Sequence, residues 1–400
     1  MSGPVVAKLV LHIGQHKTGS TALQSFLTRH AAGLSERGLL YPAEPPSTHG
    51  VRSFSISHYR LFVLLRREVL EAVGERAEAE RFWEKQRRFC APFGSVQDFF
   101  EALESERTRL GAGTVILSAE DLFDLQSAHE IAFSPDWVKA GAQLLARFAA
   151  TFHYAPRVVA YVRRQDHLLA AHYGEYIKGN PGQDVEFGAF AEAFAPRLRT
   201  HAILAPWVAA FGAEHVAVRP YEAAVQSSGI VSDFFDQALG LSVPSGLTQP
   251  LDALSRNASP DRDHLEFLRH LRRGSLRGGA FIQERDVLAA ARLETTGAGR
   301  GTGIGAWLSP QARRDLLAVH AEGNAALARL APGRMGHASL FTEPLPADDA
   351  AWHDYPGLSP ARLREIAANV RQVAAGRPAG QRLRWFLRVL KRQLRASLSS

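Results

Sequence analysis

The chain has 400 residues but a single cysteine, Cys90. One cysteine excludes an intrachain disulfide framework and any metal site built from several thiolates. We expect Cys90 to be a small core side chain. The apolar run that follows Lys8, from Leu9 to Ile13, is too short for a membrane span or for the apolar part of a secretory signal. These absences predict a cytoplasmic protein.

Lysine is scarce and arginine abundant, and the formal net charge is +7 with a pI near 9.7. This charge favours anionic partners such as phosphate esters, acidic glycans, nucleic acids or anionic lipids, without choosing among them. Hydrophobic residues make up 46% of the chain and charged residues 22%, which is typical of globular rather than disordered proteins. The length allows two or three ordinary domains, or one α/β domain with insertions.

Strands alternate with helices through the first 250 residues. Segments rich in β-branched and aliphatic side chains predict buried strands at 5–13, 113–121, 157–166 and 215–222. Helices are expected from Ser20 or Thr21 onward, over 59–90, 96–110 and 166–179, and after the fourth strand, where one face carries Val231, Phe234, Phe235 and Leu239. Residues 39–58 are expected to be irregular. The pattern predicts an α/β fold with a parallel β-sheet flanked by helices.

Beyond residue 250 the predicted elements are helical only. The expected helices lie near 260–273, 283–294, 309–330 and 360–375. We therefore expect an α/β domain over 1–342, whose helical portion from about 250 forms either a lid or a separate domain. A proline-rich linker and a helical C-terminal extension are expected over 343–400.

The turn between the first strand and the first helix has the sequence GQHKTGST, residues 14–21. Backbone N–H groups in such a loop, together with the positive end of the helix dipole, form a site for phosphate or sulfate. Lys17 adds a cation, and Gly19 lets the backbone approach the anion closely. In the ATP- and GTP-binding loop the lysine stands directly before the hydroxyl residue, whereas here the order is K-T-G-S-T. That order, and the lack of a clearly placed aspartate for magnesium, disfavour a kinase or GTPase.

The order K-T-G-S-T is similar to the 5′-phosphosulfate loop of bacterial sulfotransferases, which commonly reads K-[ST]-G-[ST]-[ST]. The resemblance covers roughly residues 8–342, through HIGQHKTGSTALQSFL, RGLLYP, HVAVRPYEAAV and two later helical segments. It implies a P-loop-like sulfotransferase fold and 3′-phosphoadenylyl sulfate (PAPS) as sulfuryl donor. It also implies that the 5′ end of this nucleotide is held by His16, Lys17, Thr18, Gly19, Ser20 and Thr21.

The same family carries a 3′-phosphate signature, an arginine at a strand end with a serine eight residues later and a tyrosine nearby. Arg163 closes the strand VVAYV, and Tyr173 follows it. A guanidinium matches phosphate oxygens well, so Arg163 is predicted to bind the 3′-phosphate. The serine position is Ala171, which has no hydroxyl, so His172 or a backbone N–H would have to replace it. Arg300, near Trp307, resembles an element that closes over the nucleotide.

Sulfuryl transfer depends on positioning and electrostatics, and an alcohol acceptor also needs a base. Lys17 is predicted to stabilise the transferring group and the leaving phosphate. Glu120, at the end of a parallel strand, is the first candidate for the base, with His58 and Glu44 as the others. No metal is expected, because no cluster of ligand residues has a coherent spacing.

The C-terminal segment 381–398 has apolar side chains on one helical face and arginines on the remainder. Such a helix either lies on an anionic membrane surface, here the inner face, or packs on the domain. The leading function is transfer of a sulfuryl group from PAPS to a hydroxyl or amine, with a carbohydrate or surface glycan as acceptor. The alternatives are an ATP-dependent P-loop phosphotransferase and a non-catalytic anion- or nucleic-acid-binding protein with a decayed nucleotide site. No nucleic acid partner is expected, since no RNA- or DNA-binding motif is present.

Overall fold

The computed structural model describes the following parts of the chain: residues 6–43, 56–179, 185–247, 260–272, 284–295, 307–331, 339–345, 347, 352 and 354–376. Three features of interest in the sequence lie outside these residues, namely Glu44, Arg300 and the segment 381–398. None of the helices in the described ranges combines the length and the apolar character needed to cross a bilayer.

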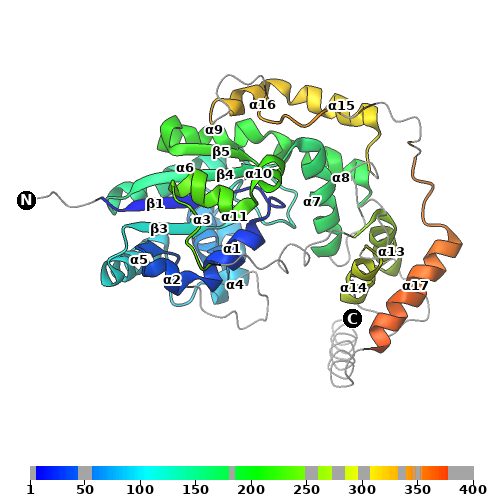
Figure 1. The fold of residues 1–400 in the computed structure, drawn as a ribbon, viewed down its shortest axis with the longest axis horizontal. Coiled ribbons are helices and arrows are strands. Elements are labelled where there is room, and N and C mark those ends of the chain that lie inside the picture. Colours follow the sequence, from blue (N-terminus) through cyan, green and yellow to red (C-terminus); the bar gives the residue numbers. More distant parts are fainter. Residues whose placement is uncertain are drawn as a thin grey trace, which may run out of the picture. The chain divides into compact units, whose positions relative to one another are not determined.

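Five parallel strands form one sheet in the order β2-β3-β1-β4-β5. Figure 1 labels the last four strands of this order. The strands are β1 (Lys8–His12), β2 (Leu39–Leu40), β3 (Thr114–Ser118), β4 (Ala155–Val162) and β5 (Val216–Pro220). The predicted α/β class and its parallel sheet are confirmed, and each of the four predicted strands is present. β2 was not assigned from the sequence, because two residues are too few to show a periodicity.

Helices cover both faces of the sheet, so side chains on both sides of each strand are buried. Alternate residues of β1 show this arrangement, since Leu9 and Leu11 belong to one apolar cluster and Val10 to the other. The Val10 face is covered by α1 (Ser20–Arg29), α2 (Ala31–Ser35), α10 (Tyr221–Ser227), α11 (Ile230–Phe234) and the π-helical turn Phe235–Leu239. Burial on both faces explains why these strands read as nearly continuous apolar runs.

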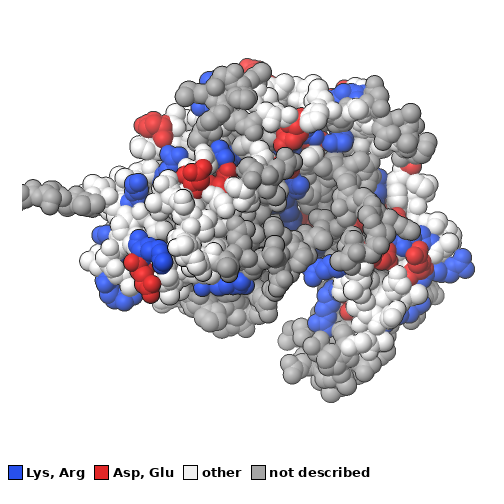
Figure 2. All heavy atoms as spheres, viewed as in Figure 1, with Lys and Arg blue, Asp and Glu red and all other residues white. Residues whose placement is uncertain are grey.

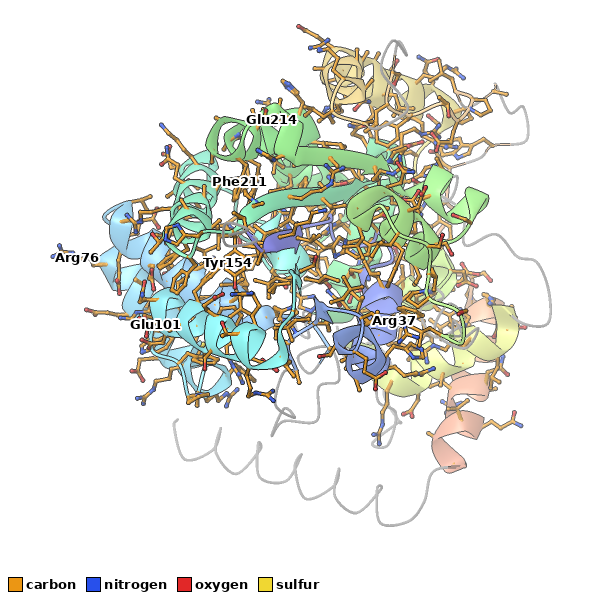
Figure 3. All side chains as sticks on the ribbon, turned by 60° about the vertical axis from the view of Figure 1, so that its left-hand side comes forward. Arg37, Arg76, Glu101, Tyr154, Phe211 and Glu214 are labelled. Atoms are coloured by element: carbon orange, nitrogen blue, oxygen red, sulfur yellow. The ribbon has the colours of Figure 1, made fainter. Side chains whose placement is uncertain are left out.

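The opposite face packs against a larger set of helices. They are α3 (Tyr59–Ala72), α4 (Arg76–Gln86), α5 (Val96–Leu110), α6 (Pro135–Thr151), α9 (Thr200–Phe211) and α16 (Ala321–Ala328). Tyr154, just before β4, donates a hydrogen bond of 2.7 Å to Glu104 of α5 and so fixes this layer at the amino ends of the strands (Tyr154 is labelled in Figure 3). The candidate site lies at the other ends of the strands.

Two helices of this layer, α6 and α9, were not predicted from the sequence. Helix α9 contains Pro206, a residue that normally interrupts a helix. Its buried residues Ile203, Leu204 and Trp207 nevertheless anchor it against the sheet. Helix α6 has a recognisable start, with Ser134 at the N-cap and Pro135 in the first helical position.

Contacts divide the chain into two compact units. The first comprises residues 1–172, 191–257 and 313–346, and contains the sheet; the second comprises 173–190, 258–312 and 347–400. Both α7 (Gln165–Gly179) and α8 (Phe187–Phe194) contribute residues to each unit. This division by contacts has no boundary at residue 342, and helices from before and after that residue share the second unit. The expected domain bounds stay a prediction.

The four helical segments predicted beyond residue 250 are present, but the one predicted over 309–330 forms two helices, α15 and α16, with His320 between them. The helices are α13 (Arg262–Arg272), α14 (Glu284–Thr295), α15 (Pro310–Val319), α16 and α17 (Pro360–Ala375). Within the second unit, α13, α14 and α17 pack against one another. No strand follows β5 in the described part of the chain, as expected.

Candidate functional site

The site lies at the carboxyl end of β1, the central strand of the sheet. Its neighbours are β3 on one side and β4 on the other, and all three strands end at the same edge. In open parallel sheets, ligands bind in the crevice at this edge. The crevice lies where the strand order reverses, between two neighbouring strands whose connections leave toward opposite sides of the sheet. Three segments meet here: the loop 13–19 after β1, the turn after β3 that begins at Ala119, and Arg163 after β4.

The loop after β1 continues along β4 before it turns into α1. The N–H of Ile13 donates to the Val159 carbonyl at 3.0 Å, and the N–H of Gln15 donates to the Tyr161 carbonyl at 2.8 Å. The chain then reverses through two residues with left-handed backbones, Lys17 at φ 70° and Gly19 at φ 75°. The loop thus has a defined turn geometry, set by pairing with β4 at one end and by the start of α1 at the other.

Gly19 is required by the packing of the loop as well as by its backbone angle. A Cβ at this position would lie 2.9 Å from Cε2 of Tyr221 and 3.1 Å from Cδ1 of Ile230. The ring of Tyr221 therefore rests directly on the backbone of the loop. Any side chain here would have to displace that ring.

We expect Gly19→Ala to lower the free energy of unfolding by more than the backbone cost alone, which is about 1–2 kcal/mol for a left-handed residue. Gly111→Ala is the matched control, because Gly111 has a similar backbone (φ 64°) and a Cβ added to it would meet no atom within 4 Å. Thermal unfolding of the two variants measures the difference. Equal losses would show that Tyr221 does not constrain the loop.

Donors for an anion gather at the start of α1. The first N–H groups of a helix have no acceptor within the helix, and those of Ser20 and Thr21 belong to this first turn. Ser20 is buried, whereas Lys17 and Thr21 are half-exposed. The charge of Lys17 is also among the causes that lower the pKa of His172, after burial, Arg197 and His16. Backbone donors, a helix dipole and a lysine together can hold a phosphate or a sulfate.

Gln15 fastens the loop to its surroundings. Its side-chain oxygen accepts from the N–H of Arg163 at 2.8 Å, and its amide nitrogen donates to Oγ1 of Thr200 at 3.1 Å. One buried amide thus links the loop, the end of β4 and the start of α9. Sequence reasoning missed this residue, because its role depends on contacts with segments 148 and 185 positions away.

His16, predicted to bind the nucleotide, is a buried side chain. Its Nε2 is 3.1 Å from the Gln126 carbonyl and 3.6 Å from Oδ1 of Asp121. Burial lowers the pKa of His16, with the charge of Glu120 opposing that effect. At neutral pH His16 is therefore uncharged, and its ring ties the loop to the turn after β3.

Glu120 lies beside the loop, as its place at the end of β3 predicted. It opens a single 3₁₀ turn, Glu120–Leu122, and Oε2 accepts a 2.6 Å hydrogen bond from the side-chain amide of Gln24 in α1. Burial would raise the pKa of Glu120, but the positive charge that His16 carries when it is protonated and the Gln24 hydrogen bond outweigh burial and lower the pKa. Glu120 is thus a carboxylate at neutral pH.

The neighbouring carboxyl, Asp121, has the opposite shift. Burial and the charge of Glu120 raise the pKa of Asp121 well above its ordinary value. When the pKa values of two adjacent carboxyl groups are pushed apart, the group with the lower pKa can act as a base and the other as an acid. The sequence showed only that an acidic pair ends the strand.

A chain of hydrogen bonds connects Glu120 through Gln24 and Ser118 to His12. The Gln24 amide also donates to Oγ of Ser118 at 3.2 Å, and that hydroxyl is 2.7 Å from Nδ1 of His12. Burial lowers the pKa of His12 to about 4, so this histidine is neutral. Gln24 was not singled out from the sequence, although it lies one helical turn after Ser20.

His58, the second candidate base, is fully buried at the start of α3. The Ser118 N–H donates to its Nδ1 at 2.9 Å, and its own N–H donates to the Ser118 carbonyl at 2.9 Å. Burial lowers the pKa of His58 to about 4. This geometry favours a structural link between α3 and β3, so catalysis by His58 stays a prediction with less support than that by Glu120.

The two arginines after β4 differ in their surroundings. Arg163 is half-buried; its Nε donates to Glu222 at 2.7 Å, and its guanidinium carbon lies 5.5 Å from the centre of the Tyr221 ring. Arg164 is buried, and its Nε donates to Asp166, which also pairs with Arg313 at 2.9 Å. Arg163 is therefore beside the ring that covers the loop, whereas Arg164 belongs to a structural ion-pair network.

Arg197 and Asp124 form a buried ion pair of 2.7 Å next to the loop. With His16 and His172 they border a cavity of about 10 Å³, which is close to the smallest volume that holds a water molecule. Neither residue was predicted, because a buried ion pair between segments 73 residues apart leaves no local signal. Its effect is to hold the turn after β3 against the Arg197 segment.

Three comparisons with known proteins were negative. A scan against protein-family models, a search of curated proteins and a search of solved structures each find no match to this chain.

Proposed function

We propose that the chain is a sulfotransferase that moves a sulfuryl group from PAPS to a hydroxyl or amine, with a carbohydrate as the acceptor. One observation carries the proposal: a strand-to-helix loop with Lys17 lies at the central strand of a parallel sheet, and a half-buried carboxylate, Glu120, lies beside it. An anion site and a base are the two parts that sulfuryl transfer to an alcohol needs. The K-T-G-S-T order and the resemblance to bacterial sulfotransferases supply the identity of the donor.

The nucleotide supplies an activated sulfuryl group. Lys17 and the N–H groups of Ser20 and Thr21 would hold its 5′ end and neutralise the negative charge that grows on the leaving phosphate oxygen. Glu120 would take the proton of the acceptor hydroxyl as the new oxygen–sulfur bond forms and the sulfur–oxygen bond to phosphate breaks. Gln24 would keep the Glu120 carboxylate in a fixed orientation through its 2.6 Å hydrogen bond.

Arg163 would bind the 3′-phosphate. Its ion pair with Glu222 would have to be exchanged for the ligand, and the ring of Tyr221 would guide the guanidinium. Ala171, in α7, offers no hydroxyl to assist. Arg163 therefore carries more of the 3′-phosphate recognition here than an arginine that acts with a serine.

We expect Arg163→Ala to weaken binding of adenosine 3′,5′-bisphosphate by roughly 10- to 100-fold, the effect of losing a charge-assisted hydrogen bond. Binding of adenosine 5′-monophosphate, which has no 3′-phosphate, should change little. Isothermal titration with both ligands measures this. Equal losses for the two ligands would assign Arg163 to the fold or to another part of the nucleotide.

The acceptor proposal follows from the family resemblance and the net positive charge. On the face drawn in Figure 2, basic and acidic side chains of the described residues are interspersed, so the charge there does not form a field of one sign. Such a face does not favour a long polyanion such as nucleic acid. A cytoplasmic location, with contact to the inner membrane face through 381–398, completes the proposal.

Two measurements in sequence test the function. The purified chain should be retained on immobilised adenosine 3′,5′-bisphosphate, and should then transfer labelled sulfate from PAPS to members of a glycan panel. Retention without transfer to any acceptor would favour the non-catalytic alternative, for which Ala171 is the best support. Magnesium-dependent turnover of ATP without sulfate transfer would favour the phosphotransferase.

A further inference from the structure

The second unit contains a cluster of potential metal ligands that is separate from the loop after β1. Asp261 lies just before α13, His264 is in its first turn, and Glu294 is near the end of α14. Ligand atoms of these three residues all lie within 4.8 Å of one another. No metal was expected from the sequence, because no cluster of ligand residues has a coherent spacing there. Glu294 is 30 positions from His264 and 33 from Asp261, and only the packing of α13 against α14 brings the three together.

The imidazole of His264 is fully buried and oriented by Asp261. Oδ1 of Asp261 lies 2.7 Å from Nδ1 of His264 and also accepts the His264 backbone N–H at 2.9 Å. A carboxylate accepts only, so Nδ1 carries the proton. Nε2 on the other side of the ring has no hydrogen-bond partner within the described residues, and lies 3.7 Å from Oε1 of Glu294.

The charge around this histidine favours a second cation. Arg362 of α17 lies within 4.0 Å of four carboxylates, those of Asp261, Asp263, Glu294 and Glu365. One guanidinium therefore faces four negative charges. It binds Oε2 of Glu294 at 2.6 Å, which leaves Oε1 on the side of His264.

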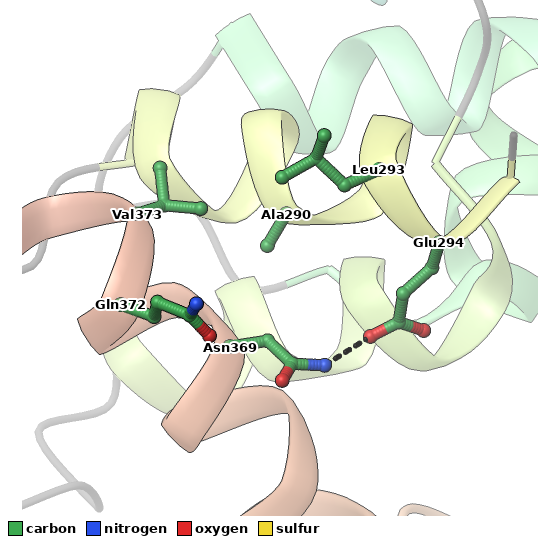
Figure 4. A pocket seen from close by; sticks show the side chains of 6 residues that line it. All are labelled: Ala290, Leu293, Glu294, Asn369, Gln372 and Val373. Carbon is green, nitrogen blue, oxygen red and sulfur yellow. Dashed lines mark hydrogen bonds between the residues drawn. The ribbon is translucent and has the colours of Figure 1, made fainter. Parts of the chain in front are cut away.

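A solvent-accessible pocket reaches the same carboxylate. It has a volume of about 450 Å³ and lies between α14 and α17, with Ala290, Leu293 and Val373 as its apolar wall (Figure 4). At its polar end, Asn369 donates from Nδ2 to Oε1 of Glu294 at 2.8 Å. A 180° flip of the Asn369 amide would point its oxygen, in place of its nitrogen, toward His264 and Glu294. The pocket also has room for water molecules beside these side chains.

We propose that this cluster binds one divalent transition-metal ion of the zinc class. Nε2 of His264, Oε1 of Glu294 and the side-chain oxygen of Asn369 are the protein ligands, and water from the pocket completes the shell. Asp261 holds the histidine from behind, the arrangement that orients most metal-bound imidazoles. An imidazole ligand favours zinc, cobalt or nickel over magnesium and calcium, which select oxygen ligands.

The alternative to a metal ion between Nε2 of His264 and Oε1 of Glu294 is a proton on Nε2, which would form an ion pair with Glu294. Metal titration distinguishes a metal ion from a proton at this position. The full chain, stripped with a chelator, is titrated calorimetrically with Zn²⁺, and Co²⁺ is added in a parallel experiment to read the visible absorption of a low-symmetry site. We expect one site per chain, lost in His264→Ala and weakened about 10- to 100-fold in Asp261→Asn.

The matched control is His270→Ala, since His270 lies on the same helix, is half-exposed and is outside the cluster. It should bind Zn²⁺ as the unaltered chain does. Glu294→Gln, which preserves size, tests the site in case His264→Ala does not fold, and should remove the rise in melting temperature that Zn²⁺ gives. The proposal would be overturned if the unaltered chain did not bind Zn²⁺, or if His264→Ala and His270→Ala bound it equally. Either result would mean that a proton, not a metal ion, lies between His264 and Glu294. None of these measurements depends on sulfuryl transfer, so this inference and the proposed function fail separately.

Discussion

Lys17→Met is expected to lower the rate of sulfate transfer from PAPS by about 10²- to 10³-fold, the effect of removing one preorganised charge donor from a transition state. Methionine keeps the unbranched apolar stem and loses only the ammonium. Lys17 is half-exposed and already has a left-handed backbone, so the substitution adds no new backbone cost. Single-turnover transfer of labelled sulfate measures the rate, and thermal unfolding checks the fold.

Lys8→Met is the matched control for this variant. Lys8 opens β1, the same strand that leads into the loop, and is exposed at the opposite end of the sheet. It should retain the rate of the unaltered chain. Full activity in Lys17→Met would exclude the loop lysine from catalysis, whatever the ligand.

Glu120→Gln is expected to lower kcat by about 10²- to 10⁴-fold with little change in nucleotide affinity, because it removes the base and leaves the anion site intact. The glutamine is nearly isosteric, so the 3₁₀ turn after β3 should persist. Glu101→Gln is the matched control, since Glu101 makes the same change of side chain at an exposed position of α5, and it should leave kcat unchanged. Full activity in Glu120→Gln would remove this residue as the base.

The pH dependence gives a second readout of the same group. Since the pKa of Glu120 is lowered, this proposed base is ionised at neutral pH, and the rate should fall only as the pH drops through that lowered pKa. Gln24→Leu removes the hydrogen bond that lowers the pKa, so the acidic limb should move to higher pH. An unchanged limb would mean that Gln24 only packs against β3.

Much of the fold is local in origin and was predictable. Strands buried on both faces have long apolar runs, and the turn GQHKTGST shows its strand-to-helix role through glycine and hydroxyl residues. The place of Glu120 followed from parallel topology, because residues at the carboxyl ends of neighbouring strands meet at one edge. The helices beyond residue 250 followed from their periodicity.

Other parts depend on contacts that no local pattern encodes. Gln15 has no distinguishing signal in the sequence, yet its amide joins three segments of the site. His58 had a residue type suited to catalysis, but full burial against β3 favours a structural role. The Asp261, His264 and Glu294 cluster required two helices to pack before its spacing was visible.

The most direct test of the central claim is a crystal structure of the chain with adenosine 3′,5′-bisphosphate. We expect the 5′-phosphate to lie against the backbone of residues 16–21, with the Lys17 ammonium within hydrogen-bonding distance and the 3′-phosphate beside Arg163. A nucleotide bound at any other edge of the sheet, with this loop making no contact to it, would contradict the account.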